Sequence, residues 1–288
     1  MNIITKLLCS AACLAATSVS AKDLEVTHWW TSGGEAAAVS TLAKAFNEKT
    51  DHNWIDGAIA GGGGTSIPAI ISRIIGGEPM GATQLNHGRQ AQELIEAGMM
   101  TDLTEIAEAQ GWRDIVNPVS LLDSCTVDGR VYCVPVNIHS AQWLWVSHGA
   151  FEKAGLAIPK NWDEFVAGSA ELEKNGIVPL AMGQQGWQQS IAFGALVLGV
   201  VGVDKFLEVT GDKNAEVAAG PEWTRAFQSV ANARELARKS KVQDWNLATN
   251  MVITDTAGGQ IMGDWAQGEF QVAGEVAGVD YSCLPGMG

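Results

Sequence analysis

Two adjacent tryptophans stand a few residues before a glutamate in the stretch HWWTSGGE, which runs from His28 to Glu35. An indole ring offers a flat apolar face, and a carboxylate accepts hydrogen bonds in fixed directions. A pyranose sugar presents the matching surfaces, because its C–H groups form an apolar face and its hydroxyls form directed hydrogen bonds. Trp29, Trp30 and Glu35 could therefore contact a sugar at one strand-to-helix junction.

Each of these three residues also has a purely structural interpretation. Ser32 and Glu35 have the S-x-x-E spacing of a capping box, in which the glutamate only closes the helix N-terminus. Successive side chains of a strand point to opposite faces, so Trp29 or Trp30 could belong to the core. The chain has 11 tryptophans and 2 tyrosines, a ratio that favours a use of indole faces beyond core filling.

Patterns of common catalytic and cofactor sites are missing from the sequence. Its five histidines show no HExxH spacing, and none has a spacing to cysteine or carboxylate that is typical of zinc, so we expect no metal. The stretch GGGGTS at 61–66 lacks the following Gly-Lys-Ser/Thr of a phosphate loop, and we expect no cofactor. No G-x-S-x-G elbow occurs. Paired carboxylates can lie far apart in sequence, so a secreted glycoside hydrolase remains the alternative function.

Composition and charge narrow the class of protein. With 288 residues and 47% hydrophobic content, the chain is long enough for two globular domains. Its formal charge of −14 argues against a nucleic-acid partner, because phosphate backbones are bound by clusters of lysine and arginine. We expect a monomer.

The first 21 residues have the pattern of a secretory signal. Lys6 precedes an apolar stretch from Leu7 to Ala16, and Val19 and Ala21 stand where a signal peptidase reads small residues. We expect an exported chain that begins at Lys22. A lipid anchor at Cys13 is the alternative. We expect no other segment to be apolar enough to span a bilayer.

Three cysteines follow the signal. A predicted three-residue loop from Asp128 to Arg130 would place Cys125 opposite Cys133, and in an exported protein this pair is expected to form a disulfide. Two buried thiols are the alternative. Cys283 is then either a free thiol or bonded to a partner outside this sequence.

Strand and helix patterns alternate along the chain and predict an α/β architecture with largely parallel sheets. LEVTHWW reads as a strand and 35–49 as a helix, and a second helix follows GGGGTS. The apolar stretch 131–147 could cross between two lobes. Further helical patterns cover 162–174, 190–207 and 221–241.

Several motifs together resemble one known family. HWWTSGGE, GGGGTSIPAIISRIIGGEPMGATQLNHGRQ, DGRVYCVPVNIHSAQWLW, NWDEFV and MGDWAQGEF are similar to the glucose and mannose solute-binding proteins of bacterial ABC sugar transporters, within extracellular solute-binding protein family 1. The resemblance covers essentially the whole mature chain. It implies a non-catalytic periplasmic receptor of two α/β lobes joined by a hinge, which closes on one monosaccharide and delivers it to a membrane permease. We expect the first lobe at 22–136, rejoined by 270–288, and the second at 137–269.

The resemblance also implies a set of sugar-binding residues. The family's tandem tryptophans and acidic ligand fall on Trp29, Trp30 and Glu35. The polar stretch QLNHG replaces a lysine of some members and offers Gln84 and His87. The implied contacts of the second lobe and the further cleft candidates are Trp245, Trp265, Asn137, His139 and Trp187. Core packing is the alternative for the three tryptophans, and hydrogen bonding near the hinge is the alternative for the other two.

The chain departs from the family at its end. Members usually continue well beyond Gly288, so we expect the C-terminal portion of the fold to be absent, either in a fragment or in a truncated product. For a product of this length the expectation is an incomplete core and weak binding.

Overall fold

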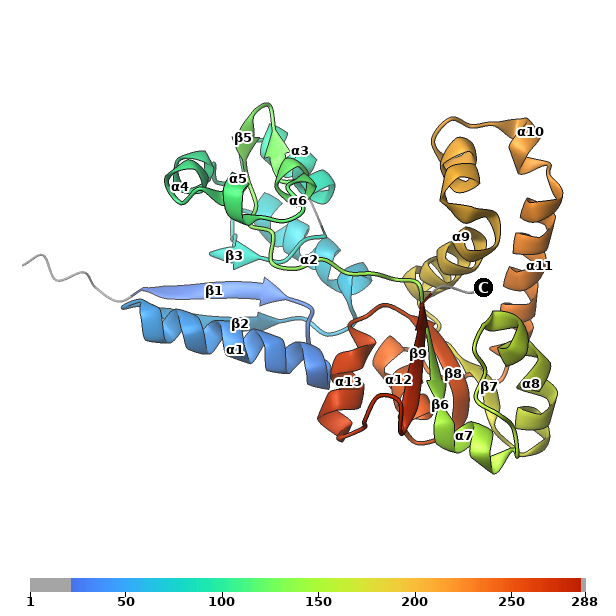
Figure 1. The fold of residues 1–288 in the computed structure, drawn as a ribbon. Coiled ribbons are helices and arrows are strands. Elements are labelled where there is room, and N and C mark those ends of the chain that lie inside the picture. The colour runs from blue at the N-terminus through green and yellow to red at the C-terminus, as the bar shows by residue number, and fades with distance from the viewer. Residues whose placement is uncertain (1–21, 87, 286–288) are drawn as a thin grey trace, which may run out of the picture.

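The computed structural model describes residues 22–86 and 88–285, so the expected signal at 1–21 and His87 lie outside the described residues. Figure 1 shows two groups of elements joined by a long extended segment. We call them the first lobe, from β1 to β5, and the second lobe, from β6 to β9. The α/β two-lobe fold expected from the sequence is confirmed.

A parallel sheet of order β2-β1-β3 forms the base of the first lobe. Its elements are β1 (Asp23–His28), α1 (Gly33–Lys49), β2 (Asn53–Ala58), α2 (Gly63–Ile75) and β3 (Ala82–Thr83). The isoleucine spacing in α2 places Ile70 and Ile74 in a core with Met80 and Leu94, as the helical period predicts.

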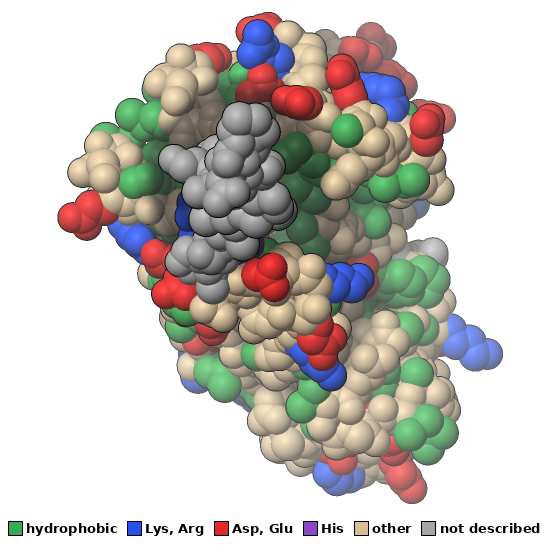
Figure 2. Space-filling model, turned by 90° about the vertical axis from the view of Figure 1, so that its left-hand side faces the viewer, with side chains coloured by type: hydrophobic (Ala, Val, Ile, Leu, Met, Phe, Trp, Pro, Cys, Tyr) green, Lys and Arg blue, Asp and Glu red, His purple; other side chains and the backbone are tan. Residues whose placement is uncertain are grey.

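Short elements complete the first lobe. They are η1 (Gly88–Ala91), α3 (Gln92–Glu96), α4 (Thr104–Ala109), α5 (Trp112–Ile115), α6 (Ser120–Asp123), β4 (Thr126–Val127) and β5 (Arg130–Val131). Figure 2 shows acidic side chains spread across the face at the left of Figure 1, interspersed with lysine, arginine and hydrophobic side chains.

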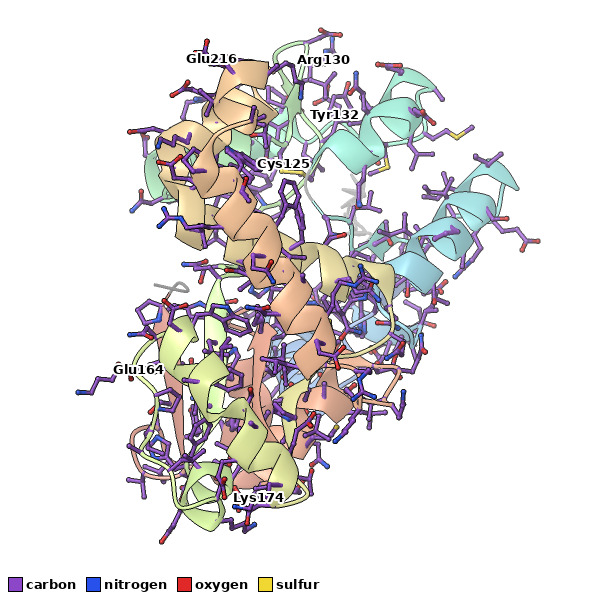
Figure 3. The ribbon with its side chains drawn as sticks, turned by 90° about the vertical axis from the view of Figure 1, so that its right-hand side faces the viewer. Cys125, Arg130, Tyr132, Glu164, Lys174 and Glu216 are labelled. Carbon is purple, nitrogen blue, oxygen red and sulfur yellow. A yellow bond between two sulfur atoms is a disulfide. The ribbon has the colours of Figure 1, made fainter. Side chains whose placement is uncertain are left out.

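The β4–β5 hairpin corrects the expected loop. Thr126 pairs with Val131, so the loop has two residues, Asp128 and Gly129, rather than three. Both have positive φ, 50° and 77°, as a tight primed turn requires. Cys125 therefore stands opposite Tyr132, whose N–H donates to the Cys125 carbonyl over 2.9 Å. The Cys125–Cys133 disulfide is nevertheless confirmed (Figure 3).

The second lobe is built on a mixed sheet of order β7-β8-β6-β9. Its elements are β6 (Trp143–Ser147), α7 (His148–Lys153), α8 (Trp162–Lys174), β7 (Val178–Ala181), α9 (Gly186–Thr210), α10 (Ala215–Ala218), α11 (Pro221–Leu236), α12 (Trp245–Ile253), β8 (Ala257–Met262), α13 (Ala266–Ala273) and β9 (Tyr281–Pro285). β7 and β8 are parallel, whereas β6 runs antiparallel to β8 and β9. The expectation of largely parallel sheets thus holds for the first lobe but not for the second.

The position of β9 differs from the expected return of 270–288 to the first lobe. β9 pairs with β6 along its whole length, from Ser147 opposite Tyr281 to Trp143 opposite Pro285. The physical reason is aromatic packing, because the Tyr281 ring lies 4.1 Å from Phe270 and 5.9 Å from Trp145 between centroids. Residues 281–285 therefore belong to the sheet of the second lobe.

Helix α9 corrects the expectation that no segment after the signal is apolar enough to cross a membrane. By length and composition alone α9 would suffice. In the fold it packs along α11 and against β8, with Ala192 and Leu196 buried in the core of the second lobe. Figure 3 shows α11 crossing in front of this lobe.

Candidate functional site

Trp29 and Gln84 are joined by a hydrogen bond at the carboxyl end of β1. The Trp29 ring is 9% exposed and packs with Ile70. Its backbone N–H donates to Oε1 of Gln84 over 3.1 Å. Gln84 in turn continues from β3, where its own N–H donates to the Thr27 carbonyl. The amide oxygen of Gln84 is therefore engaged in holding the backbone that carries Trp29.

Trp30 follows Trp29 beyond the end of β1 at His28, and its ring packs against the same core cluster as Trp29. It is half-buried and lines a cavity of about 330 Å³ between α1, β1 and β2, together with His28, Trp54 and Asp56. His28 Nε2 lies 2.5 Å from Asp56 Oδ1, and its Nδ1 accepts the Trp30 N–H over 3.2 Å. Trp30 thus contacts both the core cluster of Trp29 and this cavity.

Glu35 lies in the first turn of α1 and closes it. Ser32 donates its hydroxyl to Glu35 Oε2 over 3.0 Å and its N–H over 3.4 Å. Burial raises the pKa of the Glu35 carboxyl above its ordinary value; the bonds from Ser32 oppose that rise, and the charge of Glu269 adds to it. The capping interpretation is thus part of the structure, and it leaves Glu35 Oε1 without a contact from Ser32.

An aromatic cluster in the second lobe is centred on Trp265. The centroid of its ring lies 6.3 Å from Trp187, 6.5 Å from Trp245 and 5.0 Å from His139. Trp245 is 7% exposed and acts mainly as core, whereas Trp187 and Trp265 are half-buried. A Cβ at Gly263 would overlap the Trp265 ring, so glycine is what lets this ring fold back over the end of β8.

A chain of polar contacts joins the connecting segment to the aromatic cluster. His139 Nδ1 lies 2.8 Å from Asp264 Oδ1, and His139 Nε2 lies 2.7 Å from Asn137 Nδ2. Asp264 Oδ2 also accepts the Ser140 N–H over 3.2 Å. A carboxylate at Nδ1 favours the tautomer with its proton on that nitrogen. Asn137 and His139 are exposed, so the hydrogen-bonding interpretation holds and both side chains still face solvent.

The two lobes meet at the glycine-rich loop 61–64. Nε2 of Gln185 lies 3.4 Å from the Gly61 carbonyl and donates to Asp244 over 2.8 Å. A Cβ on Gly62 would stand 3.7 Å from Trp187 Nε1, and one on Gly63 would stand 3.6 Å from the Trp29 ring. The loop is therefore placed between a tryptophan of each lobe.

The structure thus brings together Trp29, Gln84 and Trp187 through this loop, and it joins Trp265, Trp245, Asn137 and His139 into one cluster. Trp30 lines the cavity beside α1 and also packs against the core cluster of Trp29. His87 lies outside the described residues.

Four polar residues that make contacts in this region were not among the site residues predicted from the sequence. They are Asp244, Asp264, Gln185 and Glu269. Asp264 could have been predicted, because it directly precedes Trp265 in the GDW motif. Within residues 22–86 and 88–285, no group of three or more His, Cys, Asp or Glu side chains could hold a metal ion.

Comparisons with known proteins agree on one family. The model of bacterial extracellular solute-binding proteins matches residues 30–285. A probable sugar-binding periplasmic protein of Rhizobium meliloti is 37% identical over 278 residues, which cover 96% of this chain and 66% of the relative. Five relatives matched over more than nine tenths of this chain are longer proteins, of which the chain spans 60% to 66%.

Solved structures share the fold at low sequence identity. A protein from a study of xylan utilization by Caldanaerobius polysaccharolyticus superimposes with a TM-score of 0.74 at 17% identity, covering 92% of this chain and 68% of that one. The bacterial solute receptor AcbH, described as preferring β-D-galactopyranose, gives a TM-score of 0.69 at 17% identity, with coverage of 93% and 67%.

Proposed function

Because the chain belongs to the bacterial extracellular solute-binding proteins, we propose that it is the periplasmic substrate-binding component of an ABC transporter. It captures a monosaccharide of the glucose or mannose class between its two lobes and delivers the sugar to the membrane permease. The names of its relatives, probable sugar-binding periplasmic proteins, support the sugar as ligand.

The observation that carries this proposal is the aromatic cluster around Trp265, with polar groups on its rim. Half-buried indoles beside a carboxylate, an imidazole and an amide offer both kinds of surface that a pyranose needs. Trp187 and Trp265 supply the apolar faces, and Asp264, His139 and Asn137 supply the hydrogen bonds.

Closure of the two lobes follows from the same arrangement. A sugar that contacts both lobes gains interactions that exist only when the lobes are close, and it therefore favours the closed form. The glycine-rich loop and the Trp187 edge are the surfaces that approach each other. The permease then recognises the closed shape.

The contacts of two acidic residues favour a receptor over a glycoside hydrolase. Hydrolysis needs a general acid and a second carboxylate that are free to act at the glycosidic bond. One oxygen of each carboxylate is already engaged, because Glu35 Oε2 accepts from Ser32 and Glu269 Oε1 accepts the Gly34 N–H. Both therefore stabilise the start of α1.

Calorimetric titration against a panel of free hexoses and glycosides tests the proposed function. We expect heat of binding and a raised melting temperature with a hexose, and no released product with a glycoside. Trp265→Ala should weaken binding about tenfold, which corresponds to about 1.4 kcal/mol, within reach of one aromatic contact. Trp112→Ala is the control, because Trp112 packs in the first lobe near the disulfide. Turnover of a glycoside, or no binding of any hexose, would overturn the proposal.

A further inference from the structure

The start of α1 touches the second lobe through α13. The Gly34 N–H donates to Glu269 Oε1 over 2.9 Å, although the two residues are 235 positions apart. Figure 1 shows α13 beside the end of α1 at which the helix begins. The first turn of α1 is therefore capped from the other lobe.

Glycines on both helices make this contact possible. A Cβ on Gly34 would stand 2.7 Å from the backbone of Gly268, and a Cβ on Gly268 would stand 3.0 Å from Gly34 Cα. Real Cβ atoms do not approach a backbone so closely, so any larger residue at Gly34 must separate α1 from α13. A Cβ on Gly33 would lie 3.4 Å from Val272 and 3.5 Å from Glu269 Oε2. The position of α1 relative to α13 is thus narrowly defined.

The carboxylate of Glu269 is a favourable acceptor at the N-terminus of α1. The first N–H groups of a helix have no partner within the helix, and the aligned peptide dipoles make this end positive. An anionic acceptor there orders the first turn. Gly34 is the residue directly before Glu35, so the bond from Glu269 holds the backbone that carries the Glu35 carboxylate.

We propose that Glu269 is a positioning residue for sugar binding: from the second lobe it holds the first turn of α1, so that Glu35 is presented to the ligand only while the lobes are in contact. This inference rests on the proposed function and on Glu35 as a sugar contact. Capture by the first lobe is then coupled to the approach of the second.

Calorimetric sugar titration of matched variants tests the inference. Glu269→Ala should lose about tenfold in affinity, the size that loss of a charge-assisted hydrogen bond produces. Glu269→Gln keeps an amide oxygen that accepts the Gly34 N–H, and its affinity should stay within about threefold of the wild type. Gln271→Ala is the control on the same helix, since Gln271 is exposed.

A double-mutant cycle separates positioning from a general structural effect. Positioning acts through Glu35, so Glu269→Ala should cost little further affinity in a Glu35→Ala background. Gly34→Ala should also weaken binding, whereas Gly194→Ala, at a site with nothing within 4 Å of the added Cβ, should not. Unfolding measured without sugar shows that each variant is folded.

The outcomes distinguish the inference from the proposed function. Wild-type affinity in Glu269→Ala, or the same fold loss with and without the Glu35 carboxylate, overturns the inference alone. A wild-type chain that binds no monosaccharide overturns the proposed function and this inference with it.

Discussion

Trp29 and Trp30 are neighbours in sequence and pack in one core cluster of the first lobe, in which Trp29 is buried and Trp30 half-buried. Trp29 packs with α2 and approaches the glycine-rich loop, whereas Trp30 lines the cavity beside α1. Strand periodicity would place the two rings on opposite faces, but β1 ends at His28, so the alternation does not extend to them. A second aromatic surface comes from Trp265 and Trp187 of the second lobe, whose ring centroids lie 6.3 Å apart.

Glu35 carries a prediction about pH. Its pKa is raised, chiefly by burial, so the folded chain holds this proton to a higher pH than the unfolded chain does. The contribution of Glu35 to stability is therefore fully present below the unfolded pKa, and it is lost as pH rises through the folded pKa. In Glu35→Gln this loss should disappear. Denaturant unfolding from pH 4 to 8 of both proteins measures the difference.

Glu25 provides a control, because its pKa is shifted in the opposite direction from that of Glu35. Hydrogen bonds from Arg73, at 2.6 and 2.9 Å, lower the pKa of the Glu25 carboxyl. Its stabilising contribution is present above the unfolded pKa and is lost as pH falls through the folded pKa. Glu25→Gln should thus lessen the loss of stability in acid. A Glu35→Gln profile parallel to that of the wild type would contradict the assignment for Glu35.

Among the helices, α9 offers a matched pair of glycines. Gly202 interrupts it with φ 78° and ψ 166°, a conformation that almost only glycine adopts, whereas Gly194 is helical. A Cβ at either position meets nothing within 4 Å. Gly202→Ala should therefore cost about 1–3 kcal/mol through backbone strain alone, and Gly194→Ala should gain about 0.5–1 kcal/mol.

Equilibrium unfolding in urea of the two variants measures these changes. Equal effects of both substitutions would show that backbone conformation does not control the stability of α9. The pair also tests the turn at Gly202, because residues on both sides of it contact α11: Phe193 packs on Phe227, and Lys205 pairs with Glu222.

The β4–β5 hairpin shows how local patterns succeed and fail. The Asp-Gly pair correctly indicated a turn, and the disulfide between Cys125 and Cys133 is present. The loop is one residue shorter than expected because Asp128 and Gly129 both adopt positive φ. A Cα–Cα distance of 5.1 Å between the cysteines lets the bridge form even though they are not directly opposite.

For the molecule as a whole, closure on a sugar is the central prediction. We expect the radius of gyration from small-angle X-ray scattering to fall when saturating hexose is added, because the ligand stabilises the form in which the lobes are close. Trp265→Ala at the same hexose concentration should show a smaller change. An identical radius with and without saturating sugar would contradict closure.

Local patterns of the sequence were sufficient for the α/β class, for the longest helices and for the cysteine pair, because helix periodicity, caps and turns depend on residues a few positions apart. The partner of β9 and the contact of Asp264 with His139 could not be predicted from local patterns. They depend on packing between segments more than a hundred residues apart, as does the bond from Gly34 to Glu269. Which side chains share one site is therefore a property of the folded chain, since only tertiary packing brings such distant segments within reach of each other.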